Sequence, residues 1–319
     1  MGAYVIRRLA TGVLVLLIVS VLLYLGLSLA PGDELTARLS PEVVAQLSHE
    51  QIAQQRAALG LDQPLPVRYA RWLGDALRGD LGYSSVDGVS VADDLRRHIG
   101  PTVLLLGTAL VIGTLFALVL GVVAAIKQHT AIDYVLSSLP VVLIGIPGFV
   151  LALGGIYLFS VKLGWLPTSG MHTLGDDSLG DLVKHLVLPA SVLAIGFAAP
   201  LLRYTRASML DVLGSEYVTT ARAKGLSGRS VIVRHAFRSA LLPVITAIGI
   251  RLPETIAGAV IVEQVFGWPG MGQLAVRAAA GRDIALMLGI VLLVAVTVTI
   301  VNLLVDLAYA KADPRVRLA

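Results

Sequence analysis

Long apolar stretches separated by polar connections dominate this chain. Six of these stretches are long enough to cross about 30 Å of hydrocarbon at about 1.5 Å per helical residue. The third contains Gly145, Pro147 and Gly148, so we expect this span to kink. The fourth is short. The predicted spans are 9–30, 102–126, 134–161, 186–202, 241–265 and 284–310.

Composition supports an all-α integral membrane protein. Of the 319 residues, 56% are hydrophobic and only 14% are charged, and the mean hydropathy is +0.82. A soluble domain is about a quarter charged. The chain has no cysteine, which excludes disulfides, thiolate metal sites and cysteine nucleophiles. The net charge of +4 is not clustered in a soluble domain, so we expect a lipid bilayer and no nucleic acid as a partner.

The distribution of Lys and Arg predicts the orientation. If the N-terminus is cytoplasmic, the inner segments are 1–8, 127–133, 203–240 and 311–319. They hold thirteen basic residues against four acidic ones, whereas the outer segments hold eleven basic and fourteen acidic residues. Cytoplasmic loops carry the excess of positive charge. Both termini are therefore expected in the cytoplasm.

The spans divide the chain into four parts. Residues 1–30 form the N-terminal transmembrane helix; its apolar run is longer than that of a signal peptide, so we expect it to be retained. An extracytoplasmic helical loop region follows at 31–101. Residues 102–310 form a five-helix core that contains the inner loop 203–240, and 311–319 form a cytoplasmic tail.

The extracytoplasmic region carries local helix signals. Ser40 and Pro41 predict one helix start. Ser48 and Gln51 have the spacing of a capping box, and Gly60 predicts the end of that helix.

The chain lacks the motifs of catalysis. The sequence HEQIAQ at His49 has Ala53 where a zinc protease needs its second histidine. There is no G-x-S-x-G elbow and no phosphate-binding G-x-x-x-x-G-K-[ST] loop. The six histidines are scattered without ligand spacing. We expect no catalytic residue, no metal site and no cofactor in this chain, and we expect any ATP hydrolysis to belong to another protein.

Two opposite charges lie within the fifth predicted span. Arg251 and Glu254 are three residues apart and so share one helix face. A charge in mid-membrane is costly without a partner or water. One interpretation is a mutually neutralised pair buried between helices. The other is a pair that lines a translocation path and meets the charged ends of a polar cargo.

A short polar helix is predicted within the inner loop 203–240. Ser215 can cap a helix from Glu216 to Lys224, and Gly225 is suited to end it. The charges of Glu216, Arg222 and Lys224 suit the helix dipole. One alternative is a loop that is basic only to fix orientation. Four small residues favour instead a surface that another protein can approach closely: Thr219, Thr220, Ala221 and Ala223.

The segment EYVTTARAKGLSGRSVIVRHAFRSALLPVIT closely resembles the coupling loop, or EAA loop, of membrane subunits in binding-protein-dependent ABC importers. The resemblance is strongest to the first-permease (B-type) subunit of the dipeptide/oligopeptide branch, and it runs nearly end to end. Other matching segments are RRLATGVLVLLIVSVLLYLGLSLAPGD, LGLDQPLPVRYARWLGDALRGDLGYS, GPTVLLLG, LGWLPTSG, HLVLPASVLAI, RYTRASMLDVLGSEYV, VEQVFGWPGMGQL and NLLVDLAYAKADPRVRL.

This resemblance implies a type I ABC-importer-like fold whose cytoplasmic coupling helix docks into an ATPase. Thr219-Thr220-Ala221 occupy the Glu-Ala-Ala place, Gly225 the family glycine, and Leu242-Pro243 the closing Leu-Pro. Thr replaces Glu and the first Ala, and Pro243 lies further from Gly225 than in the general consensus, as in the peptide branch. The implied ATPase-coupling residues are Glu216, Thr219, Thr220, Ala221, Arg222, Ala223, Lys224, Gly225 and Leu226.

The resemblance also implies partners, cargo and location. The partners are a second homologous permease, two ATP-binding subunits or domains that bind ATP and Mg²⁺, and an extracytoplasmic substrate-binding protein. Di- or oligopeptides are the expected cargo, with nickel, glutathione or oligosaccharide as alternatives for the same architecture. The location is the bacterial cytoplasmic membrane. A stand-alone gradient-driven carrier is the alternative of another class; unlike the importer, it would transport without ATP while its gradient lasts.

Overall fold

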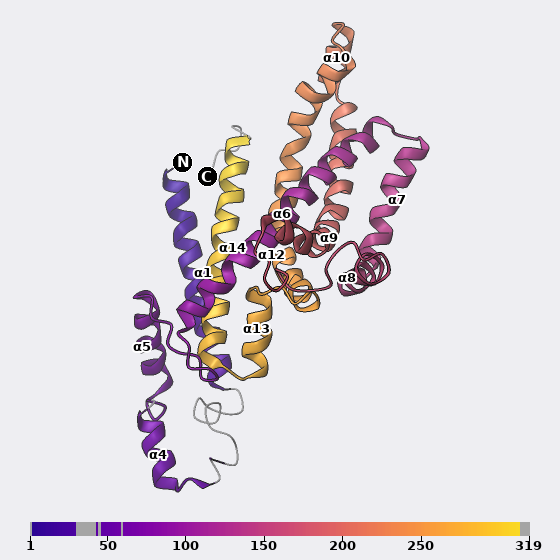
Figure 1. Ribbon diagram of the computed structural model, residues 1–319. Coiled ribbons are helices and arrows are strands. Elements are labelled where there is room, and N and C mark those ends of the chain that lie inside the picture. The colour runs from indigo at the N-terminus through magenta and orange to yellow at the C-terminus, as the bar shows by residue number, and fades with distance from the viewer. Residues whose placement is uncertain (1, 30–42, 44–45, 59, 313–319) are drawn as a thin grey trace. The chain divides into compact units, whose positions relative to one another are not determined.

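A computed structural model describes residues 2–312 except 30–42, 44–45 and 59 (Figure 1). The predicted helix start at Ser40 and Pro41, and most of the tail 311–319, lie outside the described residues. The described part is helical and contains no β-strand beyond two isolated bridges. The chain forms two compact units, one of residues 1–101 and 270–300 and one of residues 102–269 and 301–319.

The helices follow one another with short connections. In chain order they are α1 (Gly2–Ser28), α4 (His49–Ala58), α5 (Leu65–Leu77), α6 (Val91–Ile126), α7 (Ala131–Gly145), α8 (Gly148–Gly155), the π-helix η1 (Ile156–Lys162), α9 (Leu179–Leu213), α10 (Glu216–Ala223), α11 (Gly228–Ser230), the π-helix η2 (Val231–Ala236), α12 (Phe237–Val265), α13 (Met271–Ala280) and α14 (Ile284–Ala312).

Long apolar helices confirm the predicted membrane architecture. Among the described residues, five helices are long and apolar enough to span a bilayer, and a sixth span results if one bent pair counts as a single span. That pair is α7 with α8 and η1, which meet at an angle of 100°. The bend lies at the predicted kink: Ile146 is extended, with φ −93° and ψ 123°, as a residue before proline prefers.

Helix α9 is longer than the predicted span 186–202. It begins after Ser178, whose Oγ accepts a hydrogen bond from the Asp181 amide at 3.2 Å. It continues past Arg203 and Arg206 and ends at Leu213 before Gly214. The segment 203–240 is therefore not one loop, because polar side chains beyond the apolar run do not end a helix whose other face stays buried.

The first unit packs α13 and the beginning of α14 against the first turns of α6. Gly289 is essential for this packing, because a Cβ there would lie 2.6 Å from Val91 Cγ1. The buried residues of this core are Val91, Leu95, Met271, Leu274, Ala278, Leu286 and Ile290.

Two buried carboxylates fasten the same unit. Asp283 accepts hydrogen bonds from the Ser84 hydroxyl, the Ser85 amide and, at 3.1 Å, the Leu286 amide, so it also caps α14. Asp94 pairs with Arg277 Nη2 at 2.6 Å. The turn before α6 and the connection between α13 and α14 are thereby held together.

The second unit is organised around α9 and α12. Helix α6 approaches α9 closely, since a Cβ at Gly121 would lie 2.6 Å from Thr205 Cβ. Small residues permit such close contacts between membrane helices. The main buried cluster of the unit is Leu105, Ala109, Ala152, Leu186, Leu188, Ala190, Val192, Leu193, Ala194, Ala259, Val262, Phe266 and Trp268.

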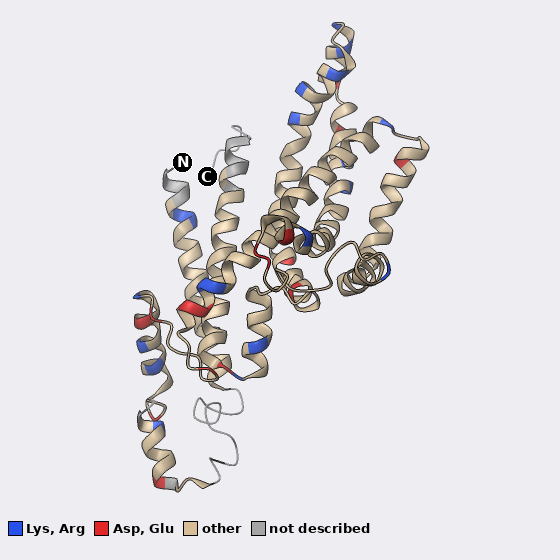
Figure 2. Cartoon of the chain, viewed as in Figure 1, with Lys and Arg blue, Asp and Glu red and all other residues tan. Residues whose placement is uncertain are grey.

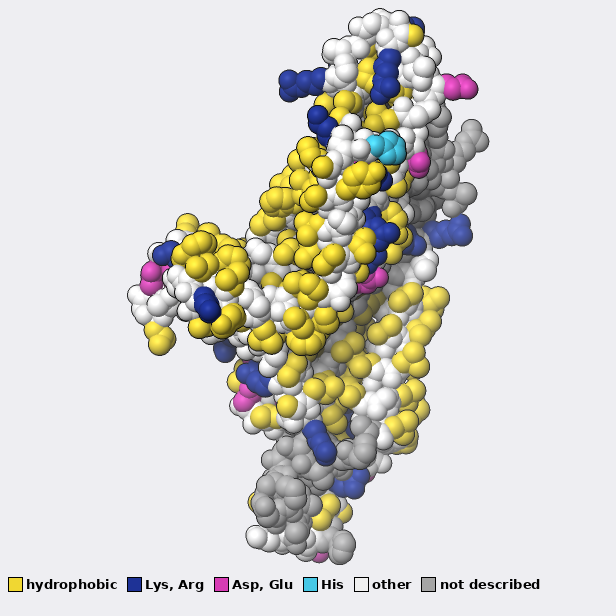
Figure 3. Space-filling model, turned by 90° about the vertical axis from the view of Figure 1, so that its right-hand side faces the viewer, with side chains coloured by type: hydrophobic (Ala, Val, Ile, Leu, Met, Phe, Trp, Pro, Cys, Tyr) yellow, Lys and Arg dark blue, Asp and Glu magenta, His cyan; other side chains and the backbone are white. Residues whose placement is uncertain are grey.

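Large apolar side chains are also exposed on the second unit. Val135 and Val142 of α7 are each 60% exposed, and Leu153 of α8 is 55% exposed. Figure 3 shows that hydrophobic side chains cover much of the face in view, while charged side chains gather towards its ends. A surface of this kind is suited to lipid or to another apolar protein.

An ion pair joins α7 to α9. Arg206 Nε donates to Asp133 Oδ1 at 2.6 Å and Arg206 Nη2 donates to Oδ2 at 2.8 Å. The Asp133 carboxylate is 4% exposed, and it also accepts from the His129 amide at 3.0 Å and the Ser137 hydroxyl at 3.1 Å. This bidentate pair fixes the start of α7 against α9.

Replacing Arg206 by Met should destabilise the fold. The substitution leaves a buried carboxylate without its counter-ion, and because Arg206 is partly exposed we expect about 2 kcal/mol, somewhat below the value for fully buried pairs. The unfolding midpoint of the purified protein in detergent should fall by several degrees. Arg203→Met, at an exposed position of the same helix, should leave the midpoint unchanged. Equal midpoints for the two variants would contradict a stabilising role for the pair.

Candidate functional site

Helix α10 has the predicted extent, but its start is not capped as expected. Ser215 is the N-cap residue, with φ −77° and ψ 151°, yet its side chain makes no capping hydrogen bond. The Ser215 hydroxyl donates instead to the Val212 carbonyl at 2.6 Å. Ser215 therefore closes the end of α9 while its backbone starts α10.

The end of α10 follows the prediction for Gly225. This glycine has φ +80°, its amide donates to the Arg222 carbonyl at 2.9 Å, and the Leu226 amide donates to the Ala221 carbonyl at 3.3 Å. This pair of hydrogen bonds is the Schellman motif. A residue with a side chain would be strained at this φ, so glycine ends the helix and turns the chain sharply towards α11.

One side of α10 is buried in the chain's own core. Val218 is fully buried and Ala221 is 8% exposed, and both pack in a cluster with Val231 of η2. Val212 and Leu213, at the end of α9, pack against the same cluster. Ala221 was expected to let another protein approach closely, but its side chain points inwards and is needed where it is.

The other side of α10 is exposed and consists mainly of small side chains. At about 100° per residue, Glu216, Thr219, Thr220 and Ala223 lie opposite the buried pair, and all four are exposed. The Thr220 hydroxyl donates to the Glu216 carbonyl at 2.9 Å, and that of Thr219 donates to the Ser215 carbonyl at 3.4 Å. Because both hydroxyls bond to the helix's own backbone, this outer face of α10 is shallow and carries one negative charge.

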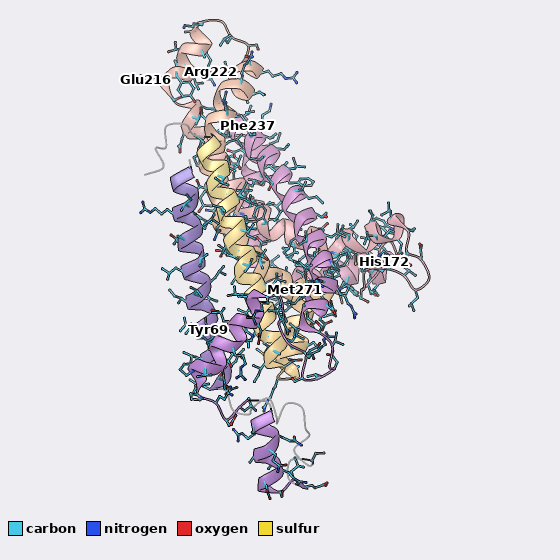
Figure 4. All side chains as sticks on the ribbon, turned by 90° about the vertical axis from the view of Figure 1, so that its left-hand side faces the viewer. Tyr69, His172, Glu216, Arg222, Phe237 and Met271 are labelled. Atoms are coloured by element: carbon cyan, nitrogen blue, oxygen red, sulfur yellow. The ribbon has the colours of Figure 1, made fainter. Side chains whose placement is uncertain are left out.

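Basic side chains surround the outer face of α10. Arg222 and Lys224 are exposed at its end, and Arg229 and Arg234 are exposed on the following turns. Figure 2 shows this group of Lys and Arg at the tip of the second unit, and Figure 4 labels Glu216 and Arg222 there. Sequence reasoning missed Tyr217, which is 46% exposed beside the outer face; only its position next to Glu216 could have indicated it.

Arg251 and Glu254 form the ion pair that their spacing predicts. Arg251 Nη1 donates to Glu254 Oε2 at 2.7 Å, and the side chains are 33% and 62% exposed. The pair is therefore not buried between helices of this chain. Arg251 lies fourteen residues into α12, about 21 Å along the helix from its beginning.

The pair lies beside two open cavities. One, of about 450 Å³, is bordered by Arg251, Glu254 and Tyr204 together with Thr246 and Pro243. The other, of about 560 Å³, shares Arg251 and Tyr204. A surface of α9 and α12 with both charge signs is thus open in the isolated chain. Among the residues that the structure describes, no group of three or more His, Asp or Glu could hold a metal ion.

Comparison with known proteins agrees with these features. The family model for the binding-protein-dependent transport system inner membrane component matches residues 117–318, and the model for the N-terminal part of such membrane components matches residues 1–88. A protein of Brucella suis biovar 1 named as a peptide permease is 43% identical over 98% of both chains. The oligopeptide transport system permease protein AppB of Bacillus subtilis is 39% identical over 99% of both.

A further relative and a solved structure extend this comparison. The glutathione transport system permease protein GsiC of Escherichia coli is 38% identical over 98% of both chains. An inward-facing structure of the MetNI methionine ABC transporter matches the fold with a TM-score of 0.58 and 18% identity, over 69% of this chain and 96% of that chain. Since one family model covers most of the chain and these relatives align along its whole length, the chain belongs to the inner membrane components of binding-protein-dependent transport systems, which are the permease subunits of ABC importers.

Proposed function

We propose that this chain, together with a second similar permease, forms the path by which di- or oligopeptides enter the cell, and that α10 transmits the movement of ATPase partners to that path. The geometry of α10 is the observation that carries this proposal. The binding protein would deliver the cargo on the other side of the membrane, and ATP and Mg²⁺ would be bound by the ATPase partners.

The two sides of α10 have different roles in this proposal. Val218 and Ala221 hold the helix against the end of α9 and the turns that lead into α12. The shallow outer face of Thr219, Thr220 and Ala223 would enter a groove on an ATPase, with Glu216 and the surrounding basic side chains setting its orientation. A rigid helix between two spans can convert a push at its outer face into a shift of both spans.

Charge supports the orientation in which α10 is cytoplasmic. The segment 203–240 holds seven Lys and Arg, and only Asp211 and Glu216 are acidic. An excess of positive charge in a short connection favours the cytoplasmic side. Both termini would then be cytoplasmic as well.

A second permease would cover the open surface that contains Arg251 and Glu254. An ion pair exposed to hydrocarbon is costly, so in the membrane this surface needs protein or water beside it. Two permeases that face each other would supply both and would place the pair beside the path.

Peptide is the cargo best supported. Relatives with end-to-end similarity are named for peptides, oligopeptides and glutathione. These cargoes carry both amino and carboxylate groups, and the Glu254 carboxylate and the Arg251 guanidinium are complementary to those groups. Nickel or an oligosaccharide would need a different set of contacts.

A bulky residue on the outer face of α10 should uncouple the transporter. Ala223→Trp should reduce cargo-stimulated ATP hydrolysis and uptake by at least about tenfold, equivalent to about 1.4 kcal/mol of lost docking energy. The readout is uptake and ATPase activity of the reconstituted complex. The unfolding midpoint of the permease should not change, because Ala223 is exposed.

Two further variants separate docking from folding. Gln128→Trp, at an exposed position between α6 and α7, should leave coupling intact. Ala221→Trp should instead lower the unfolding midpoint, because overpacking a core position costs about 1–3 kcal/mol. Full-speed transport by the Ala223→Trp complex would refute the assignment of α10.

Neutralising the ion pair of α12 should change cargo uptake without disrupting assembly. In the double variant Arg251→Leu with Glu254→Leu, both charges are lost together, so no uncompensated charge remains in the membrane. The yield of the intact complex should match the parent, while the dependence of uptake rate on cargo concentration should shift. Parental uptake of every cargo tested would show that the pair contributes only packing.

A further inference from the structure

A cavity of about 570 Å³ lies in the first unit, and neither the coupling helix nor the Arg251–Glu254 pair uses it. One wall is apolar and belongs to the ends of two membrane helices: Leu27 near the end of α1, and Ile284 and Leu288 at the beginning of α14. The opposite wall is polar and belongs to α4, α5 and the turn that follows. The cavity is therefore amphiphilic and lies at the level where spanning helices end.

The polar wall is basic and is built by one face of α5. Arg68, Arg71, Trp72 and Asp75 are spaced so that they share this face, and all four border the cavity. Arg71 extends over the end of the preceding helix, since a Cβ at Gly60 would lie 3.3 Å from Arg71 Nη1. Guanidinium groups bind phosphate with two parallel hydrogen bonds.

The two acidic residues of the wall already have other partners. Asp75 lies 3.6 Å from Arg78, which does not border the cavity, and Asp80 Oδ1 accepts from the Gly82 amide at 2.9 Å. Among the residues that the structure describes, neither Arg68 nor Arg71 forms an ion pair. These two arginines therefore keep hydrogen-bond donors for an anion.

An aromatic cluster fixes α5 at this position. The rings of Tyr24 and Tyr69 are 5.6 Å apart, and Trp72 lies 5.6 Å from Tyr24. The hydroxyls of Ser20 and Tyr69 share a hydrogen bond of 2.8 Å, and Figure 4 shows Tyr69 beside α1. Tyr and Trp are enriched at membrane–water interfaces, so the cluster places the cavity at headgroup level.

We propose that this cavity binds an anionic phospholipid, with its phosphate on Arg68 and Arg71 and its acyl chains along Leu27, Ile284 and Leu288. A soluble phosphate would satisfy the arginines but would leave the apolar wall uncovered. A lipid matches both walls. The proposal does not depend on the cargo or on the coupling role of α10.

The test measures which lipid the protein retains. The complex is reconstituted into mixed phosphatidylcholine and phosphatidylglycerol, extracted with mild detergent, and examined by native mass spectrometry. The parent protein should retain phosphatidylglycerol in preference to phosphatidylcholine. Arg68→Gln with Arg71→Gln should reduce that preference by about tenfold, as expected for loss of charge-assisted hydrogen bonds.

The matched control removes the same charge elsewhere in the same unit. Arg78 and Arg96 have side chains that are 81% and 80% exposed, and neither borders the cavity. Arg78→Gln with Arg96→Gln should retain phosphatidylglycerol like the parent. An equal loss in both double variants, or no loss in either, would overturn the proposal.

Two further arms exclude misfolding and soluble anions. Arg68→Lys with Arg71→Lys keeps the charge but not the bidentate geometry, so it should retain an intermediate preference if the cavity binds the phosphate. Inorganic phosphate added in large excess should not displace the bound lipid, because it lacks acyl chains. Displacement by phosphate alone would identify a soluble-anion site and would contradict the lipid assignment.

Discussion

The arrangement of the second unit depends on the burial of one side of α10. A helix of eight residues is not stable alone in water, because few hydrogen bonds offset the cost of nucleation. Val218 and Ala221 overcome this cost by packing against Val231 and the end of α9. The Schellman motif at Gly225 then ends the helix and returns the chain towards α12. What remains outside is a face determined by what is buried inside.

This constraint connects the tip to the spans that flank it. Helix α9 ends immediately before α10, and α12 begins shortly after it, so a displaced α10 would move both. Within the same unit, Arg206 holds α7 to α9, and a Cβ at Gly249 would lie 2.5 Å from Val305 Cγ1, so α12 and the last part of α14 are in close contact. Tight contacts of this kind transmit a displacement rather than absorb it. The open surface of Arg251 and Glu254 is part of α12 and would move with it.

The sequence was sufficient for features that depend on local pattern. Apolar length predicted the spans, Pro147 with its glycines predicted the bend, and the spacing of Arg251 and Glu254 predicted their pairing. The Ser48–Gln51 capping box is also present, with its two hydrogen bonds at 2.8 and 3.2 Å. Each of these follows from residues within a few positions of one another.

Features that depend on distant contacts could not be predicted. The polar run after residue 202 indicated a loop, but burial of Thr205 and Met209 keeps α9 helical to Leu213. The inward direction of Ala221 depends on Val231, and the Ser84–Asp283 hydrogen bond joins residues 199 positions apart. The arginine-lined cavity arises only when α5 packs on α1.

The absence of cysteine allows the central claim to be tested directly. Single cysteines at positions 223 and 221 would be treated with a maleimide, in the permease with and without its ATPase partners. We predict that the cysteine at 223 reacts rapidly in the free permease and is protected in the complex, while that at 221 reacts slowly in both. Equal reactivity at 223 with and without the ATPase, or rapid reaction at 221, would contradict a helix that docks with one side and is anchored by the other.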